Sequence, residues 1–171
     1  MAEERIILVD EEDREIGSGE KLAVHRDGRL HRAFSIFVRN GRGELLLQKR
    51  AAAKYHSGGL WSNTCCGHPR AGEALDDAVH RRLREEFGFD CGLRECFAFT
   101  YRAEFANGLI EHEVDHVYLG EYHGIPAPNP DEIEEWQWID PQALLADIRL
   151  RPERYSYWLR SVADRIVQLC R

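Results

Sequence analysis

The chain has 171 residues, of which 43% are apolar, enough for one hydrophobic core. Its formal net charge of −7 argues against a nucleic-acid partner, because proteins that bind phosphate backbones need clustered Lys and Arg. We therefore expect a single domain over residues 1–171.

Alternating apolar runs and turn residues predict two hairpins in the first 50 residues. Residues 6–9 and 15–16 flank an acidic turn and predict an opening hairpin that ends at Gly17. Residues 21–31 are polar and lack periodicity, which predicts a loop. Residues 33–38 and 44–48 flank Asn40-Gly41-Arg42-Gly43, which tolerates positive φ and predicts a second hairpin. Residues 49–60 predict a further loop.

The residues after position 72 predict an amphipathic helix that ends at Gly88. At about 100° per residue, one apolar stripe collects Leu75, Ala78, Val79 and Leu83. Gly72 is expected to cap the start of this helix, and Gly88 suits the left-handed conformation that ends many helices.

Two charged residues of this helix fall within its apolar stripe. Arg82 and Glu86 lie about 20° to either side of Leu75 on the helical wheel. A buried carboxylate needs a partner such as a metal, an arginine or hydrogen-bond donors. An ordinary i,i+4 salt bridge between Arg82 and Glu86 at the edge of the stripe is the alternative.

Strands are predicted at residues 96–101 and 109–122. Alternation along the second strand places Glu111, Glu113 and Asp115 on one face. Carboxylates at i and i+2 lie roughly 7 Å apart and can share a metal if they converge. Acids on a solvated strand are the alternative.

The end of the chain predicts a short strand at residues 136–139 and helices at 141–148 and 153–169. The last helix has an apolar face with Trp158, Val162, Ile166 and Leu169.

Charge is distributed unevenly along the chain. Residues 21–54 hold nine Lys or Arg and two acids, which favours a small anion, although these side chains could also be the solvated faces of a hairpin. Residues 109–135 hold eight acids and no Lys or Arg, which favours a cation.

The cysteines and the first residues indicate a cytoplasmic protein. None of the five cysteines has a paired CxxC spacing, which is typical of free thiols in a reducing compartment. The acidic start resembles neither a signal peptide nor a presequence, and no apolar run approaches about 18 residues. We therefore expect no membrane partner.

The segment before the helix, Asn63-Thr64-Cys65-Cys66-Gly67-His68-Pro69, is the densest in reactive groups. Together with the helix it gives the spacing Gly67-x5-Glu73-x7-Arg81-Arg82-Leu83-x-Glu85-Glu86-x-Gly88-Phe89, which resembles the Nudix box GX5EX7REUXEEXGU, U being apolar. It departs at Arg82, where Nudix hydrolases carry a glutamate that binds the catalytic metal.

The surrounding residues resemble the type 1 isopentenyl-diphosphate isomerase family. The resemblance covers about residues 5–160 and is carried by residues 61–69, by His25 and residues 29–34 upstream, and by Glu111-His112-Glu113 downstream. It implies an α/β (α+β) fold, in which a Nudix-type mixed sheet is sandwiched between helices, with an N-terminal extension and a C-terminal helix.

The resemblance also implies a metal site and a diphosphate site. The positions that match metal ligands are His25, His31, His68, Glu111 and Glu113. Three imidazoles and two carboxylates suit Mn, Zn or Mg. Glu86 matches a ligand of a second Mg²⁺ that enters with the diphosphate, and the diphosphate-binding positions are Lys21, Arg50, Lys54 and Arg82.

The implied reaction is the 1,3-allylic shift from isopentenyl to dimethylallyl diphosphate. Cys66 and Glu113 match the two proton-transferring groups, in an order that stays open, and Tyr101 matches the residue that assists the carboxyl group. Trp158 and Trp61 are expected to stabilise the carbocation, although Trp61 could equally be a core residue. Cys65 is interpreted as structural.

Two other functions remain as alternatives. One is a Nudix pyrophosphohydrolase, against which Arg82 and the cysteine segment argue, and the other is a non-catalytic metal-binding or interaction module. The sequence does not predict an oligomeric state, the native metal or the pathway that the enzyme feeds.

Overall fold

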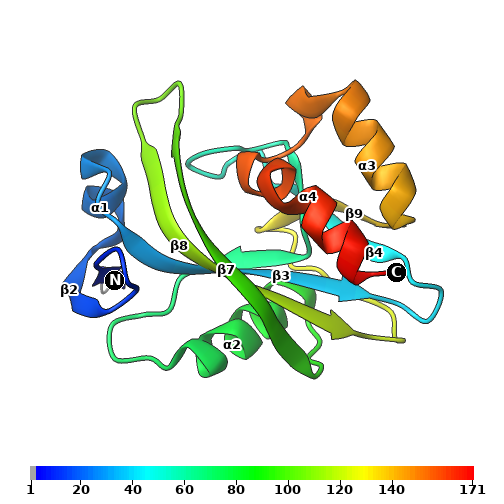
Figure 1. Cartoon of the computed structure of the whole chain (residues 1–171), viewed down its shortest axis with the longest axis horizontal. Coiled ribbons are helices and arrows are strands. Elements are labelled where there is room, and N and C mark those ends of the chain that lie inside the picture. Colours follow the sequence, from blue (N-terminus) through cyan, green and yellow to red (C-terminus); the bar gives the residue numbers. More distant parts are fainter. Residues whose placement is uncertain (1–2) are drawn as a thin grey trace.

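The computed structural model describes residues 3–171, in which nine strands form one mixed sheet with helices on both sides (Figure 1). The strands are β1 Arg5–Val9, β2 Glu15–Glu20, β3 His31–Arg39, β4 Leu45–Arg50, β5 Trp61–Ser62, β6 Cys65–Gly67, β7 Leu93–Glu104, β8 Ile110–Glu121 and β9 Ile133–Ile139. The helices are α1 Lys21–Asp27, α2 Leu75–Phe87, α3 Pro141–Leu150 and α4 Tyr157–Leu169, with a 3₁₀ turn at Pro152–Arg154. The expected α/β sandwich is confirmed. Residues 1–2 of the expected domain lie outside the described part.

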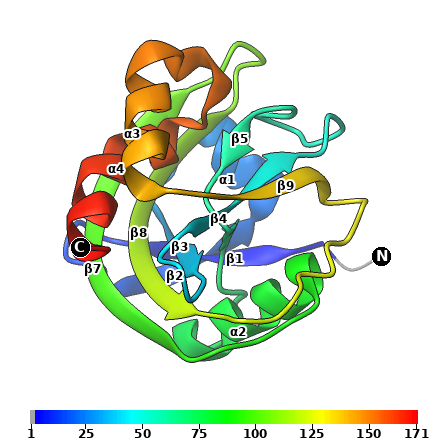
Figure 2. The same cartoon turned by 90° about the vertical axis from the view of Figure 1, so that its right-hand side faces the viewer.

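Strand β3 is the centre of the sheet. It pairs with β8 in parallel and with β1, β4 and β6 in antiparallel orientation. Its side chains alternate, so that Phe34, Ile36 and Val38 pack in the core that α2 covers, whereas Phe37 packs in the core beneath α3 and α4. Figure 2 shows α2 on one side of the sheet and α3 and α4 on the other.

Helix α2 forms where the apolar stripe predicts it. Ala78, Val79 and Leu83 are fully buried, and Gly88 ends the helix in the left-handed conformation at φ 69°. The expected cap at Gly72 is wrong, because Gly72 has a φ of 80° and belongs to the preceding turn. The helix begins after Ala74, which supplies no side-chain hydrogen bond.

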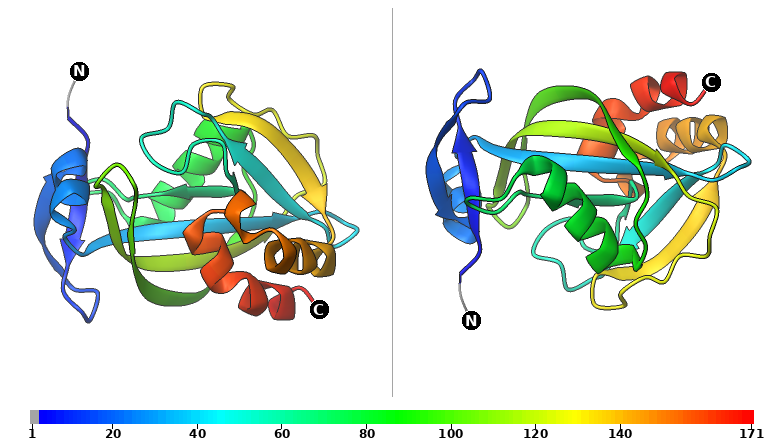
Figure 3. Two further views of the ribbon diagram at one scale, coloured as in Figure 1. Left: turned by 90° about the horizontal axis from the view of Figure 1, so that it is seen from above. Right: turned by 90° about the horizontal axis from the view of Figure 1, so that it is seen from below.

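The N-terminal unit differs from the prediction in two ways. Strand β2 continues through Gly17–Gly19 because it pairs with β1 along that length, and residues 21–27 form helix α1 where a loop was expected. The Glu20 side chain caps α1 by accepting hydrogen bonds from the Leu22 and Ala23 amides. A Cβ at Gly19 would lie only 2.6 Å from a Val24 methyl group, so glycine lets α1 pack against the strand. Figure 3 shows β1, β2 and α1 at one end of the molecule.

The turn of the second predicted hairpin is confirmed at residues 40–43, but the predicted pairing of its two strands along their length is wrong. The strands β3 and β4 pair only through Arg39 and Leu45, next to the turn. Beyond that point they diverge, because β4 pairs with β5 and β9 while β3 pairs with β6 and β8. Residues 61–67 therefore lie between the two strands.

At the end of the chain, the helix predicted at residues 141–148 is confirmed as α3, and the helix predicted at residues 153–169 begins later than expected. Residues 152–154 form a 3₁₀ turn, and α4 starts at Tyr157. Trp158, Val162 and Ile166 are buried, whereas Leu169 is 38% exposed. No helix within residues 3–171 combines the length and hydropathy of a membrane span.

Candidate active site and metal centre

A cavity of about 360 Å³ opens beside the strands β3, β6 and β8. It brings together most of the residues that the sequence indicated, although they come from seven helices and strands and from the segments that follow β4 and β6. The predicted residues that line it are Lys21, Arg50, Lys54, Cys66, His68, Arg82, Glu86, Tyr101, Glu111, Glu113 and Trp158.

The acidic face of β8 forms the floor of this cavity. Glu111, Glu113 and Asp115 are only 4%, 4% and 2% exposed, so the interpretation as a solvated strand is wrong. The same face continues with Val117 and Leu119, which pack in the core beneath α4. One face of a single strand is thus divided into a polar half at the cavity and an apolar half at the core.

The strand register places histidine and glutamate side by side. His31 on β3 pairs with Glu113 on the parallel strand β8. Helix α1 brings Nε2 of His25 to 3.4 Å from Oε1 of Glu111. His68, directly after β6, has Nε2 at 3.8 Å from the same oxygen and 3.6 Å from Oε1 of Glu113. Nε2 of His31 lies 3.9 Å from Oε1 of Glu113.

Two of these rings are oriented by the backbone. Nδ1 of His25 lies 2.6 Å from the Lys21 carbonyl oxygen, and Nδ1 of His31 lies 2.9 Å from the Arg29 carbonyl oxygen. A carbonyl only accepts, so each Nδ1 carries the proton and donates it. Each Nε2 lone pair is then free toward the carboxylates, the usual arrangement of a metal-binding histidine.

Two of the buried histidines, His31 and His68, are held in the neutral form. Burial, reinforced by the neighbouring His68 and His25 charges, lowers the pKa of His31 well below its ordinary value. Burial also lowers the pKa of His68 to about 4. Both imidazoles are therefore uncharged at neutral pH, the form that binds metal.

These residues fit a divalent metal. One ligand atom each from His25, His31, His68 and Glu111 lies within 4.8 Å of all the others. Ligands on one ion with bonds of about 2.1 Å are roughly 3–4 Å apart, and the distances of 3.4 Å and 3.8 Å from Oε1 of Glu111 to His25 and His68 fall within this range. Nε2 of His31 is buried without a hydrogen-bond partner, as expected for an atom that faces a cation.

The neighbouring carboxyl groups of Glu111 and Glu113 have pKa values that are shifted in opposite directions. Burial and the neighbouring Glu111 charge raise the pKa of Glu113 well above its ordinary value. Although burial opposes it, hydrogen bonding from Glu113 and three histidines holds the pKa of Glu111 below its usual range. The Tyr101 hydroxyl donates a hydrogen bond of 3.0 Å to Oε1 of Glu113. Of the two carboxyl groups, Glu113 therefore has the higher proton affinity, which the Tyr101 hydrogen bond partly offsets.

Asn63 positions the thiol of Cys66 and the indole of Trp158. Its Oδ1 accepts from the Cys66 thiol at 3.1 Å and from Nε1 of Trp158 at 2.9 Å. The Asn63 amide group donates to the carbonyls of Ile36 and Cys65, which fixes its orientation. Burial raises the pKa of the Cys66 thiol to about 12. Cys65 points into the core beside α2 and is fully buried.

The four predicted diphosphate ligands also line the cavity, and all of them except Arg50 contact an acidic side chain. Arg82 donates to Glu86 at 2.5 Å and to Glu132 at 3.5 Å. Lys54 also contacts Glu132, and Lys21 lies 3.4 Å from Glu4. For Arg82 and Glu86, the i,i+4 salt bridge and the buried carboxylate with a partner are both present.

Trp61 is placed differently from the expectation. It packs in the core with Leu47 and Tyr155 and is not among the residues that line the cavity. This placement favours the alternative, in which Trp61 is a core residue.

Several residues of the site were missed from the sequence. His56 and Asp115 line the cavity, and Asn63 lies behind it. Asp115 shares a predicted face with the two glutamates, so alternation could have identified it. His56 lies in a loop with no periodic pattern, and only the fold places it.

Comparisons with known proteins agree with this geometry. The NUDIX domain family matches residues 29–159. Isopentenyl-diphosphate Delta-isomerase 2 of Aromatoleum aromaticum is 55% identical over 99% of this chain and 89% of that protein. Isopentenyl-diphosphate Delta-isomerase of Burkholderia multivorans is 55% identical over 95% of this chain and 93% of that protein. 

Solved structures resemble the fold as a whole. A crystal structure from Deinococcus radiodurans superposes with a TM-score of 0.80 at 26% identity and covers 95% of this chain and 98% of that one. A MutT protein from Methanosarcina mazei gives a TM-score of 0.66 at 20% identity, over 80% of this chain and 91% of that one.

Proposed function

The chain belongs to the isopentenyl-diphosphate Delta-isomerases of the NUDIX superfamily, and from this membership we propose how its residues divide the reaction. The enzyme interconverts isopentenyl and dimethylallyl diphosphate. The double bond moves by one carbon while the terminal carbon gains a proton and C2 loses one. The observation that carries the assignment of roles is that Cys66, Glu113 and the basic residues line one cavity.

Cys66 and Glu113 are the groups that exchange protons with the substrate. They come from different strands, β6 and β8, and both line the cavity. The Tyr101 hydrogen bond stabilises the carboxylate form of Glu113 and opposes the effect of burial on its proton affinity. General acid and base groups of this kind contribute about 10²- to 10⁴-fold each.

The metal centre comprises His25, His31, His68 and Glu111, with Glu113 adjacent. A divalent ion there, Mn, Zn or Mg, would supply fixed positive charge beside the carboxyl pair. The hydrogen bonds from His25 and His31 to backbone carbonyls keep these buried ligands oriented.

Trp158 stabilises the carbocation intermediate and helps to exclude water from it. Its indole lines the cavity and is fixed by Asn63, and an aromatic face stabilises a desolvated cation by about 2 kcal/mol. Walls of Phe34, Tyr101 and Trp158 exclude water that would trap the cation.

The substrate's diphosphate binds Lys21, Arg50, Lys54 and Arg82. Because Glu86 and Glu132 face the same space, a Mg²⁺ that enters with the diphosphate would separate these carboxylates from the phosphate oxygens. Neutralisation of these carboxylates by Mg²⁺ would explain how a cavity with acidic residues can accept an anion.

The following experiment tests the proposal. Purified enzyme with Mg²⁺ and isopentenyl diphosphate should give dimethylallyl diphosphate by NMR, without release of phosphate. Cys66→Ala and Glu113→Gln should each lower kcat about 10³-fold and leave thermal unfolding nearly unchanged. Cys170→Ala, which removes a thiol outside the cavity, serves as the control. Released phosphate without the dimethylallyl product would instead indicate a pyrophosphohydrolase.

The wider assignments follow from the same function. We propose one domain over residues 1–171, since the NUDIX match ends within α4 and the N-terminal unit supplies His25 and Lys21 to the site. A cytoplasmic location with free thiols, and a small diphosphate in place of nucleic acid or membrane as partner, complete the proposal.

A further inference from the structure

A fourth imidazole lies beside the metal centre, and no role has been assigned to it so far. His56 is carried by the loop of residues 51–60 between β4 and β5, and it is only 6% exposed. Its Nε2 lies 3.2 Å from Oε2 of Glu111. Within residues 3–171 that oxygen accepts no hydrogen bond of ordinary geometry, and the His56 nitrogen lies within reach of it.

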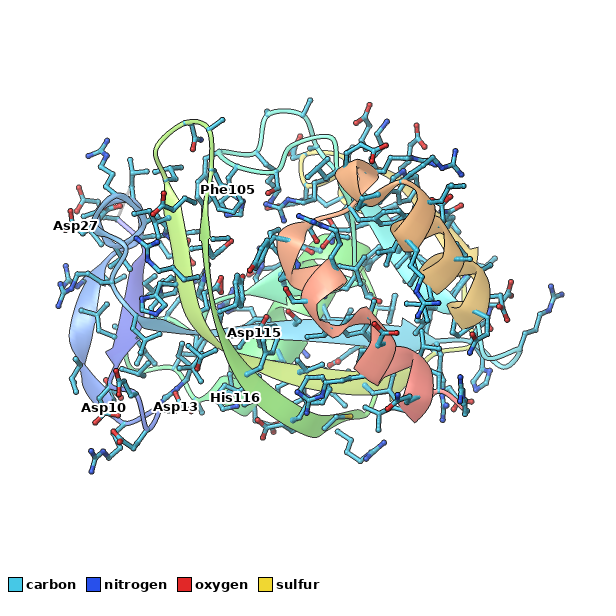
Figure 4. All side chains as sticks on the ribbon, turned by 45° about the horizontal axis from the view of Figure 1, so that its top comes forward. Asp10, Asp13, Asp27, Phe105, Asp115 and His116 are labelled. Carbon is cyan, nitrogen blue, oxygen red and sulfur yellow. The ribbon has the colours of Figure 1, made fainter. Side chains whose placement is uncertain are left out.

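The contacts of His56 hold its ring in one orientation. Nδ1 lies 3.2 Å from the Ser57 hydroxyl, which can donate to it and leave the proton on Nε2. The ring stacks on Phe105 with the centroids 4.6 Å apart and the planes 3° from parallel. Its edge meets Trp158 at 5.8 Å. Figure 4 shows Phe105 at the end of the β7–β8 hairpin.

The same loop is attached to both ends of the cavity. The Asn107 side chain at the hairpin tip donates to the Tyr55 carbonyl at 2.6 Å. The Tyr55 hydroxyl lies 3.4 Å from Nε2 of His25, and Arg50 donates to the His56 carbonyl at 3.3 Å. Lys54, a proposed diphosphate ligand, precedes these residues directly. The loop therefore joins the diphosphate end to the metal end.

We propose that His56 is a positioning residue for the metal centre, which holds Oε2 of Glu111 so that Oε1 faces His25 and His68. The inference rests on the metal site in the proposed function. A residue that orients a ligand in this way typically changes metal affinity about 10- to 100-fold. Because His56 belongs to the loop that carries Lys54, metal binding also orders the diphosphate site.

Two substitutions separate this role from simple packing. His56→Phe keeps the ring on Phe105 and removes the N–H donor, whereas His56→Gln keeps a donor and removes the ring. Mn²⁺ affinity, measured by the EPR signal of free Mn²⁺, should fall about 10-fold or more in His56→Phe and stay within about threefold in His56→Gln. Equal affinities, or a larger loss in His56→Gln, would overturn the proposal.

A second readout follows the loop itself. In the wild type, Mn²⁺ should slow amide hydrogen exchange in residues 51–60, and His56→Phe should lose this protection. Protection that persists in His56→Phe would overturn the link between the loop and the metal centre.

If His56→Phe does not fold, Ser57→Ala replaces it and should weaken Mn²⁺ binding by about threefold. His80→Gln, on the outer face of α2, is the control. Failure of the wild type to bind Mn²⁺ would overturn the metal centre as well, whereas normal binding in His56→Phe would overturn this inference alone.

Discussion

The thiol of Cys66 is neutral in the resting enzyme. Burial raises its pKa to about 12, and the thiol donates to Asn63. Because only the thiolate is alkylated rapidly, the rate of reaction with iodoacetamide should rise about tenfold per pH unit from pH 7 to pH 10 without a plateau. Peptide mapping distinguishes Cys66 from the other four cysteines. A plateau near pH 7 would contradict the neutral thiol.

The proposed role of Trp158 beside the carbocation can also be tested with a single substitution. Trp158 contributes both a ring face and an N–H group, and Asn63 accepts from the N–H. Trp158→Phe keeps the ring and loses the hydrogen bond. We expect kcat to fall about tenfold with KM within about threefold, since a neutral hydrogen bond is worth about 1 kcal/mol and fixes the ring. Steady-state kinetics check this, and a selective rise in KM would contradict it.

At the scale of elements, the turn before α2 is joined to the helix by a salt bridge between Glu73 and Arg81. Its two oxygens accept from Nε of Arg81 at 2.7 Å and from a terminal nitrogen of the same guanidinium at 2.8 Å. Hydrogen bonding from Arg81 lowers the pKa of Glu73 in the folded state. The stabilisation is therefore complete above the unfolded pKa near 4.3 and is lost as the pH falls through the folded value.

Glu73→Gln should consequently lower the free energy of unfolding by about 1–2 kcal/mol at pH 7, measured by urea denaturation. The difference from the wild type should shrink below about pH 4. Glu104→Gln removes an exposed ion pair with Arg102 and should have little effect. A Glu73→Gln defect that is independent of pH would contradict this account.

Much of the fold could be predicted at this scale, for identifiable reasons. Helix α2 is long and periodic, and β8 alternates over its whole length, so local sequence specifies both. Helix α1 has seven residues and is specified by the Glu20 cap and by packing, which periodicity does not reveal. The pairing of β4 with β9 joins segments far apart in the chain, and a turn sequence cannot predict it.

Residues of the site that belong to a sequence motif could be predicted. Cys66, His68 and Glu113 belong to recognisable patterns, and the cavity collects them. Trp61 was ambiguous because tryptophan serves equally in cores and in cavities. His56 and Asn63 act through orientation, which depends on tertiary contacts and not on spacing.

For the whole molecule, the proposed metal centre joins α1, β3, β8 and the segment after β6. A ligand that binds only the folded state stabilises it by about 2.7 kcal/mol at a hundredfold excess over Kd. For a chain of this size, Tm should rise by about 5–10 °C when Mn²⁺ is added to chelator-treated protein. His25→Gln should abolish the rise and His80→Gln should keep it. An unchanged Tm in the wild type would contradict a metal centre built from these four elements.

The parallel pairing of β3 with β8 also has a kinetic consequence. His31 and Glu113 become neighbours only after the chain between the two strands has closed into a long loop. Such contacts of high sequence separation form slowly, because the entropy of loop closure is lost before any contact compensates for it. The chain should therefore acquire metal affinity in a late step of folding, well after α2 is helical, and the site will distinguish finished molecules from nascent or partly folded ones.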